Sequence, residues 1–279
     1  MMSTSLFRIA SFSDQDRGGN PAGVWLGDSF PSDEEMQALA KELAYSETVF
    51  AIPLEQGWRV RYFSPESEVP FCGHATIALG AVLAQERGEG TYALQLNHGQ
   101  IQVEGKLTDN GMYASLQSPP TMSKDLDPAL LEEVLALFNL DVNQLDTRLP
   151  PAWMHGGADH VVLVLKDRET LSSMRYDLDL GKALMRKHQL VTIMLVYVES
   201  NQLFHSRNAF ASGGVYEDPA TGAASAAFAG YLRDSRWPHQ GFVRIIQGED
   251  MGMRSVIEAE FNEEKGSSIR ISGAARVIV

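Results

Sequence analysis

The sequence predicts an α+β protein built from two similar halves, each made of short hairpins around one central helix. Two stretches carry this prediction, since residues 71–83 and 217–232 both read as a turn that opens into a helix of small residues. The segments behind them also match, because 94–103 and 243–257 each hold an apolar strand, a glycine-containing turn and a second apolar strand. An internal duplication of roughly 130 residues is therefore indicated. Hairpins with one helix per half favour α+β over an alternating doubly wound sheet.

The length of the chain supports two domains. It has 279 residues and a mass of 30.7 kDa, which suits two domains better than one core. Ser118-Pro119-Pro120-Thr121 is the predicted linker, because consecutive prolines interrupt both helix and sheet. We expect an N-terminal half over 1–118 and a C-terminal half over 119–279, with the last strand free to return to the first half.

The elements of the first half follow from local patterns. Leu6–Phe12 reads as a strand, a glycine-rich loop follows over 18–23, and Val24–Leu26 resumes a strand. Ser32 and Glu35 have the spacing of a capping box that begins a helix. This helix is expected to run to about Leu43, and further strands are expected over 45–52, 58–63, 91–96, 100–106 and 113–116.

The second half alternates helices and strands in the same way. Amphipathic spacing predicts helices over 128–138 and 180–188. Apolar runs predict buried strands over 161–165 and 192–198. Residues 203–210 lead to the second turn–helix element, and further strands are expected over 242–247, 254–260 and 268–279.

Composition narrows the possible partners. A formal net charge of −13 argues against nucleic acid or an anionic membrane as the main partner, because phosphate binding needs a basic surface. Cys72 is the single cysteine, so an intramolecular disulfide and a cysteine-rich metal site are excluded. His155 and His160 lack a third ligand nearby, and no metal is expected. Neither a signal peptide nor a membrane span is visible, so the predicted location is cytoplasmic.

The two helix openings predict the kind of ligand. A helix N-terminus leaves backbone N–H groups unpaired and carries partial positive charge, which suits a carboxylate or phosphate. Two such openings in two similar halves indicate one small anionic molecule held between them. The glycines of residues 18–23 fit neither the phosphate loop nor the dinucleotide fingerprint in spacing, so ATP and NAD(P) are not supported.

Glu47 and His74 are the first candidates for acid–base chemistry. Glu47 stands at the mouth of an apolar strand, where a carboxylate is costly unless it is paired or faces a cleft. It could act as a general acid or base, or be a surface residue that interacts with a helix end. His74 follows Gly73 at a helix opening, where it could donate to a substrate, shuttle a proton or cap the helix. Gly73 permits close backbone approach to a ligand.

The remaining candidates each have an ordinary alternative. At Cys72 a helix N-terminus favours the thiolate, whereas the apolar flank favours an inert buried thiol. Asp218 precedes Pro219 and could cap a helix that begins with proline. It could instead orient a substrate amine or hydroxyl, with Thr221 and Gly222 as donors to an anion. Asn20 is an ordinary turn former.

Together these segments resemble the phenazine-biosynthesis PhzF-like isomerase family over nearly the whole chain. The segments that carry the resemblance occur in one order: Gly19-Asn20-Pro21-Ala22-Gly23-Val24, Ser46-Glu47-Thr48, Arg61-Tyr62-Phe63-Ser64-Pro65, Glu68-Val69-Pro70-Phe71-Cys72-Gly73-His74-Ala75-Thr76, Glu217-Asp218-Pro219-Ala220-Thr221-Gly222, Gln247-Gly248 and Arg254. The two turn–helix motifs among them are the most specific.

The resemblance implies a diaminopimelate epimerase-like fold, in which two similar halves each wrap a curved sheet around a central helix and the site lies in the cleft between them. It implies no cofactor, a small-molecule carboxylate substrate and a homodimer. Carried over by motif, Glu47 is the catalytic acid/base, and His74 and Asp218 lie beside the substrate. Gly73 and the opening at Thr221-Gly222 bind its polar groups, with Asn20 as a further binding residue and Ser46 as a possible one.

This chain also departs from the family pattern. Related epimerases and racemases use two cysteines at equivalent helix openings, but only Cys72 is present here and Pro219 occupies the second position. Family members often have serine directly after Thr-Gly, where this chain has Ala223, and Ser225 could partly replace that hydroxyl. Both departures affect substrate identity more than proton transfer.

Three functions therefore stay open at this stage. The first is a cofactor-independent isomerase that moves a proton on a small carboxylic acid through Glu47. The second is an amino- or hydroxy-acid epimerase or racemase that uses Glu47 and Cys72 as unequal bases. The third is a binding or interaction protein with a retained site. The residues that select the substrate are expected in loops over 153–160 and 210–216.

Overall fold

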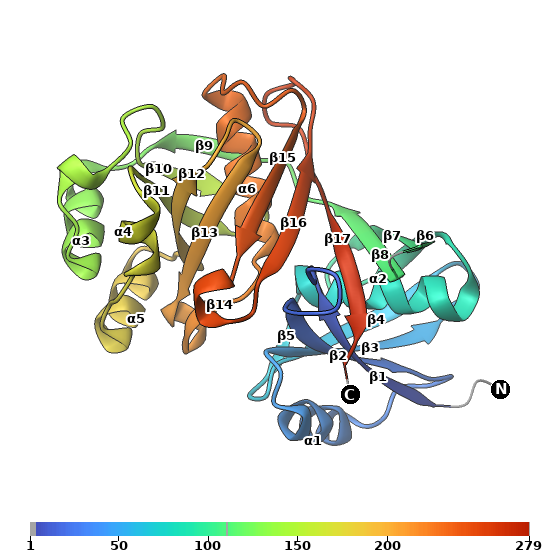
Figure 1. Ribbon diagram of the computed structural model, residues 1–279. Helices are drawn as coiled ribbons and strands as arrows, with labels where there is room; N and C mark the ends of the chain where they lie inside the picture. Colours follow the sequence, from blue (N-terminus) through green and yellow to red (C-terminus); the bar gives the residue numbers. More distant parts are fainter. Residues whose placement is uncertain (1–3, 110, 279) are drawn as a thin grey trace. The chain divides into compact units, whose positions relative to one another are not determined.

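The computed structural model describes residues 4–109 and 111–278, which fold into two compact units. The first unit comprises Met1–Gln117 together with Ser272–Val279, and the second comprises Ser118–Ile271. Figure 1 labels the helices and strands of both units in chain order. Each unit is a curved sheet around one buried helix, so the predicted α+β class with a central helix in each half is confirmed.

The sheet of the first unit closes into a ring. Its strands are β1 (Ser5–Ser11), β2 (Asn20–Leu26), β3 (Glu47–Pro53), β4 (Trp58–Phe63), β6 (Gly90–Gln95), β7 (Gln100–Thr108), β8 (Gly111–Gln117) and β17 (Arg270–Val277). They pair in the order β1-β2-β3-β4-β6-β7-β8, with β2–β3 and β4–β6 parallel. Strand β17 pairs with both β1 and β8 and thereby joins the two ends. The short strand β5 (Glu68–Val69) pairs with β4.

The helix α2 (Gly73–Arg87) fills this ring. Its residues from His74 to Ala84 are all buried, as expected for a helix that is apolar on every side. It packs against β1, β2, β3, β7 and β8. The helix α1 (Asp33–Leu43) lies outside the ring and packs against β3 and β4. Its predicted capping box is confirmed, since the side chains of Ser32 and Glu35 each accept from the other residue's backbone N–H.

The second unit has a sheet of similar construction. Its strands are β9 (Met122–Asp125), β10 (Ala152–His155), β11 (Asp159–Leu165), β12 (Thr192–Val198), β13 (Leu203–Phe210), β14 (Val215–Asp218), β15 (Phe242–Gln247) and β16 (Ser255–Glu260). They pair in the order β9-β10-β11-β12-β13-β15-β16, with β11–β12 and β13–β15 parallel. Strand β14 pairs with the end of β13.

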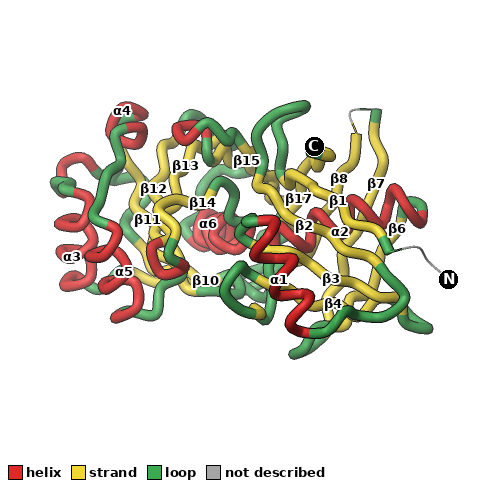
Figure 2. The backbone as a smooth tube through the Cα atoms, turned by 90° about the horizontal axis from the view of Figure 1, so that it is seen from below, coloured by secondary structure: helices red, strands yellow, loops and turns green. Residues whose placement is uncertain are grey.

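Helices cover both faces of this second sheet. The helix α6 (Gly222–Asp234) packs against β9, β10, β11 and β16, and Phe228 meets Phe204 of β13 edge to face. The opposite face carries α3 (Pro128–Phe138), α4 (Arg168–Ser172) and α5 (Leu178–Lys187) over a core that includes Leu163 and Leu195. Figures 1 and 2 both show α3 and α5 side by side on that face. Single helical turns occur at Val142–Gln144, Ala211–Gly213 and Glu249–Met251.

Two predicted loops are wrong. Asn20–Gly23 was expected in a loop, but these residues begin β2 and pair with β1. Residues 153–160 were expected as an open loop, but they form the β10–β11 hairpin with Gly156 and Gly157 at its turn. A Cβ at Gly156 would lie 2.7 Å from the backbone nitrogen of Ala227, so this glycine allows close packing against α6.

None of the helices formed by the described residues is long and apolar enough to cross a membrane.

Candidate active site

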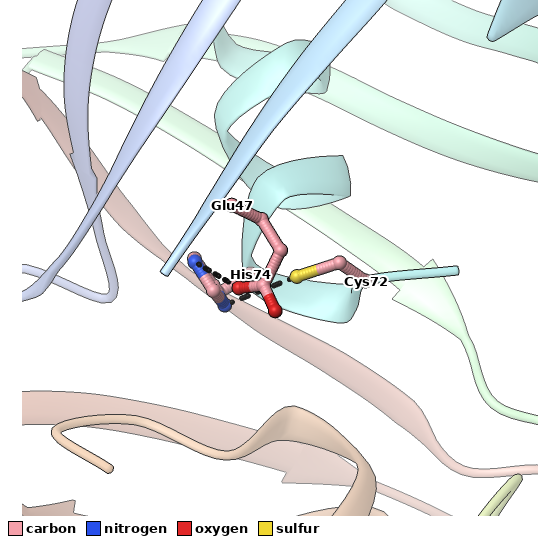
Figure 3. A group of neighbouring side chains, drawn as sticks. All are labelled: Glu47, Cys72 and His74. Carbon is pink, nitrogen blue, oxygen red and sulfur yellow. Dashed lines mark hydrogen bonds and ion pairs between the residues drawn. The ribbon is translucent and has the colours of Figure 1, made fainter. Parts of the chain in front are cut away.

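Three of the predicted site residues meet in the first unit. Glu47 is the first residue of β3, Cys72 is the N-cap of α2, and His74 is the second residue of that helix. Figure 3 shows the carboxylate of Glu47 and the sulfur of Cys72 directed at the His74 ring. Cys72 Sγ lies 3.2 Å from His74 Nδ1, and Glu47 Oε2 lies 3.5 Å from His74 Nε2. The structure therefore forms a row of thiol, imidazole and carboxylate.

The His74 ring is held from both sides. In addition to its contact with Glu47, Nε2 lies 3.3 Å from Ser46 Oγ. The backbone carbonyl of His74 accepts a hydrogen bond of 2.7 Å from Ser11 Oγ. His74 is only 7% exposed, and the Glu47 side chain is 17% exposed. The imidazole is therefore fixed in orientation, while the carboxylate keeps access to a ligand.

The start of α2 offers backbone donors that have no partner among the residues described by the structure. The Cys72 side chain does not cap the helix, and the first amide bonded within the helix is that of Thr76, which donates to Cys72 O at 3.0 Å. The preceding amides of the helix are thus available to an anion. A Cβ placed on Gly73 would meet nothing within 4 Å. The open space beside this glycine supports the prediction that a ligand approaches the backbone here.

Asn20 lies near the start of α2, at the same end of the first unit as Glu47, Cys72 and His74. It is 2% exposed and lies opposite Ser11 in the β1–β2 ladder. Ser11 donates to the carbonyl oxygen of His74 at the start of α2. Asn20 therefore lies on the strand next to the one that contacts the start of this helix. Its buried position fits a polar group with a defined partner better than an ordinary turn former.

The predicted residues of the second unit meet at the start of α6. Asp218 ends β14, and the N-cap is Thr221. Asp218 is therefore not the helix cap considered from sequence, and Pro219 precedes the helix instead of opening it. Thr221 Oγ1 donates to the Asp218 carboxylate at 2.5 Å. Because that hydroxyl bonds Asp218, it does not cap the helix. The first amide bonded within α6 is that of Ser225, which donates to Thr221 O at 3.0 Å, and the amides of α6 before it have no partner in the described part of the chain.

Gln247 organises this turn, and its role was not predicted from the sequence. It is fully buried, and its Nε2 donates to Asp218 O at 2.7 Å and to Thr221 Oγ1 at 3.0 Å. Its Oε1 accepts from Thr221 N at 3.1 Å. Gln247-Gly248 stands in the sequence as a family motif, but nothing local reveals that its side chain spans to a turn 26 residues earlier.

Ser225, considered from the sequence as a partial replacement for a hydroxyl at position 223, is buried in the structure. It lies in α6 with 0% exposure, and its hydroxyl has no hydrogen-bond partner among the described residues. The other possible site residues, Cys72 and Ser46, both contact His74.

Two units, each with a sheet around one helix that opens with free amides, define an epimerase-like class of fold. The family model described as phenazine biosynthesis-like protein (PhzC-PhzF) matches residues 9–279. The chain therefore belongs to the phenazine biosynthesis-like family, and the predicted family is confirmed. Because the curated relatives are named isomerases, the prediction of an isomerase is confirmed at the level of the family.

Two relatives illustrate the similarity. An uncharacterized isomerase of Mesorhizobium japonicum is 30% identical over 95% of this chain and 93% of its own length. An uncharacterized isomerase of Deinococcus radiodurans is 33% identical over 98% of this chain and 92% of its own length.

Solved structures share the fold. The phenazine biosynthesis protein of the PhzF family from Bacillus anthracis is 23% identical, with a TM-score of 0.85 over 100% of this chain and 98% of that one. A probable proline racemase from Agrobacterium radiobacter is 11% identical, with a TM-score of 0.66 over 99% of this chain and 91% of that one. The epimerase-like fold predicted from the sequence is confirmed.

Proposed function

We propose that this protein is a cofactor-independent isomerase that moves a proton on a small carboxylic acid, with Glu47 as the general acid/base. The observation that carries this proposal is the placement of the Glu47 carboxylate 3.5 Å from His74 Nε2, next to the open N-terminus of α2. The curated relatives named isomerases support the reaction class.

The chemistry follows from the positions of these groups. The Glu47 carboxylate removes a proton from a carbon activated by a neighbouring double bond or carbonyl, and the carboxylic acid so formed returns it to another carbon of the same molecule. The atoms balance without a co-reactant. The free amides at the start of α2 stabilise the negative charge that develops, which is worth about 3 kcal/mol for each well-placed donor. His74 holds the carboxylate in position.

The second unit contributes binding groups in this proposal. The Asp218 carboxylate accepts from a substrate hydroxyl or amine, and the free amides that begin at Gly222 bind an anionic oxygen. Thr221 is a positioning residue because its hydroxyl is bonded to Asp218. That both sets of residues act on one substrate rests on the family resemblance and stays a prediction, as do the homodimer and the cytoplasmic location.

A proton-exchange experiment tests the role of Glu47 without a known substrate. A pooled bacterial small-molecule extract is incubated with the protein in deuterium oxide and followed by mass spectrometry. We expect at least one carboxylic acid to gain deuterium with the wild type and with Glu55→Gln, a control that removes an exposed carboxylate. Glu47→Gln should remain folded by circular dichroism and give no exchange. Near-normal exchange by Glu47→Gln would show that another residue moves the proton.

A second candidate is an epimerase that uses Glu47 and Cys72 as two unequal bases. The hydrogen bond of 3.2 Å between Cys72 Sγ and His74 Nδ1 favours it, because an imidazole partner can activate a thiol. Against it stands Pro219, which occupies the position of the second thiol in related racemases. Cys72→Ser separates the two candidates: exchange that survives supports the isomerase, and a loss as large as that of Glu47→Gln supports the epimerase.

A further inference from the structure

The three side chains that meet at the start of α2 also form a set of metal ligands. The carboxylate of Glu47, the thiol of Cys72 and the imidazole of His74 each offer one ligand atom, and these atoms all lie within 4.8 Å of one another. Thiolate, imidazole and carboxylate are the donors that Zn²⁺ prefers, whereas Mg²⁺ and Ca²⁺ prefer oxygen ligands alone. No metal is expected from the sequence, because Glu47 is 25 positions before Cys72.

The spacing of these atoms suits a tetrahedral ion. Around zinc, with a Zn–S distance of about 2.3 Å and a Zn–N distance of about 2.0 Å, the sulfur and nitrogen ligands lie roughly 3.5 Å apart. Cys72 Sγ and His74 Nδ1 are 3.2 Å apart, so a shift of a few tenths of an ångström is sufficient for that pair. The ligand oxygen of Glu47 lies within 4.8 Å of the other two ligand atoms. In Figure 3 this carboxylate contacts Nε2, so the proposal requires the Glu47 side chain to rotate towards Nδ1 and Cys72.

The surroundings of the imidazole match those of a metal ligand. When Nδ1 binds the ion, Nε2 carries the proton, and Ser46 Oγ lies 3.3 Å away to accept it. Such an outer hydrogen bond fixes the orientation of a ligating histidine. The charges also balance, since a thiolate and a carboxylate together neutralise a divalent ion.

We propose that Glu47, Cys72 and His74 bind one Zn²⁺ ion with three protein ligands and one exchangeable position. This ion is an inhibitor in the proposal, because a divalent cation bound to the Glu47 carboxylate lowers its affinity for a proton and occupies the start of α2, where the substrate would bind. Metal binding and proton transfer therefore exclude one another. The binding site stands on the ligand geometry alone, while the inhibition rests on the proposed function of Glu47.

Cobalt gives a readout of the site that does not depend on activity. The purified protein is titrated with Co²⁺, which takes the place of zinc and shows a thiolate-to-metal charge-transfer absorption band, and Zn²⁺ is then added as competitor. We expect one equivalent of Co²⁺ with this band, complete displacement by Zn²⁺, and no displacement by Mg²⁺. Isothermal titration with Zn²⁺ gives the affinity.

Variants identify the ligands. Cys72→Ser should lose the charge-transfer band. It should also weaken Zn²⁺ binding by about 100-fold or more, because the loss of a residue that only hydrogen-bonds a metal ligand already weakens binding by up to about 100-fold. Glu47→Gln should keep the band and bind Zn²⁺ more weakly than the wild type. His155→Ala is the control, since His155 is another carboxylate-paired histidine, 2.5 Å from Asp159, and should bind like the wild type. Circular dichroism verifies that each variant is folded.

The outcomes separate the metal site from the catalytic proposal. A wild-type protein without the band, or a Cys72→Ser variant with wild-type Zn²⁺ affinity, would overturn the metal site. If Zn²⁺ binds but leaves deuterium exchange unchanged, the inhibition is refuted and the site stands. If Glu47→Gln exchanges normally while Cys72→Ser loses the metal, the proposed function fails and the metal site is supported.

Discussion

Replacing Gln247 by methionine tests whether one buried amide holds the start of α6. The change keeps the length of the side chain but removes three hydrogen bonds, two donated to Asp218 O and Thr221 Oγ1 and one accepted from Thr221 N. At about 1 kcal/mol net for each bond, the loss is about 3 kcal/mol of unfolding free energy. The Thr221 N–H also loses its acceptor, which adds to the cost.

Urea unfolding converts this energy into a measurable shift. With a dependence of about 2 kcal/mol per molar urea, a loss of 3 kcal/mol moves the midpoint down by about 1.5 M. Deuterium exchange should fall as well, because the turn that positions Thr221 and Asp218 loses its three bonds to Gln247. Gln117→Met is the matched control, an exposed strand glutamine that should leave the midpoint unchanged. A Gln247→Met midpoint equal to that of the control would refute this account of the turn.

Three further predictions concern a glycine, a histidine and an ion pair. Gly73→Ala should raise the unfolding free energy by about 0.5–1 kcal/mol, since alanine favours the helix and its Cβ meets nothing within 4 Å, but it should reduce exchange; full exchange would disprove ligand approach there. Burial lowers the pKa of His160 from 6.5 to about 3, so the unfolded state binds the extra proton and stability falls as pH drops from 6.5 towards 3, by up to about 1.4 kcal/mol per unit. Urea midpoints at two pH values should therefore fall further in the wild type than in His160→Gln, which keeps only the contribution of the paired carboxylates such as Asp33 and Glu68. Glu217→Gln should cost about 3–5 kcal/mol by leaving the buried Arg207 unpaired, whereas Glu258→Gln in an exposed pair should cost less than about 1 kcal/mol; equal midpoints for these two variants would contradict the difference in burial.

Elements with strong local signals were predictable almost residue by residue. The helix Pro128–Phe138 was predicted with its observed bounds, because Asp127 caps the first turn and Asn139 adopts the left-handed conformation that ends it. The strand Thr192–Val198 was also predicted with its bounds, since it lies in a long run of apolar and β-branched residues.

Errors occurred where a distant partner decides the structure. Asn20–Gly23 has the composition of a turn, but β1 pairs with every one of these residues and draws them into β2. Ala152–His155 is the first strand of the β10–β11 hairpin and pairs on its other side with β9, which lies far from it in the sequence. No local pattern reports such pairing, so both segments were read as loops.

The site residues also divide into those that a local motif predicts and those that a partner distant in sequence positions. Cys72 and His74 are two positions apart, and the motif around them places both at a helix start. That the carboxylate of Glu47 reaches this helix depends on the β2–β3 pairing, and only the family resemblance indicated it. The amide of Gln247 was missed because its partners lie on another element of the second unit.

The ring of the first unit is completed by a strand that the ribosome makes only after the whole of the second unit. Until β17 is present, β1 and β8 are both edge strands with unpaired backbone groups, and such edges recruit other strands. Since the second unit is continuous in sequence, it can fold first during synthesis. The sheet of the first unit stays open between β1 and β8 until β17 has been made. Removal of residues 272–278 would therefore affect the unit that begins the chain, and the expected phenotype is aggregation of newly made protein.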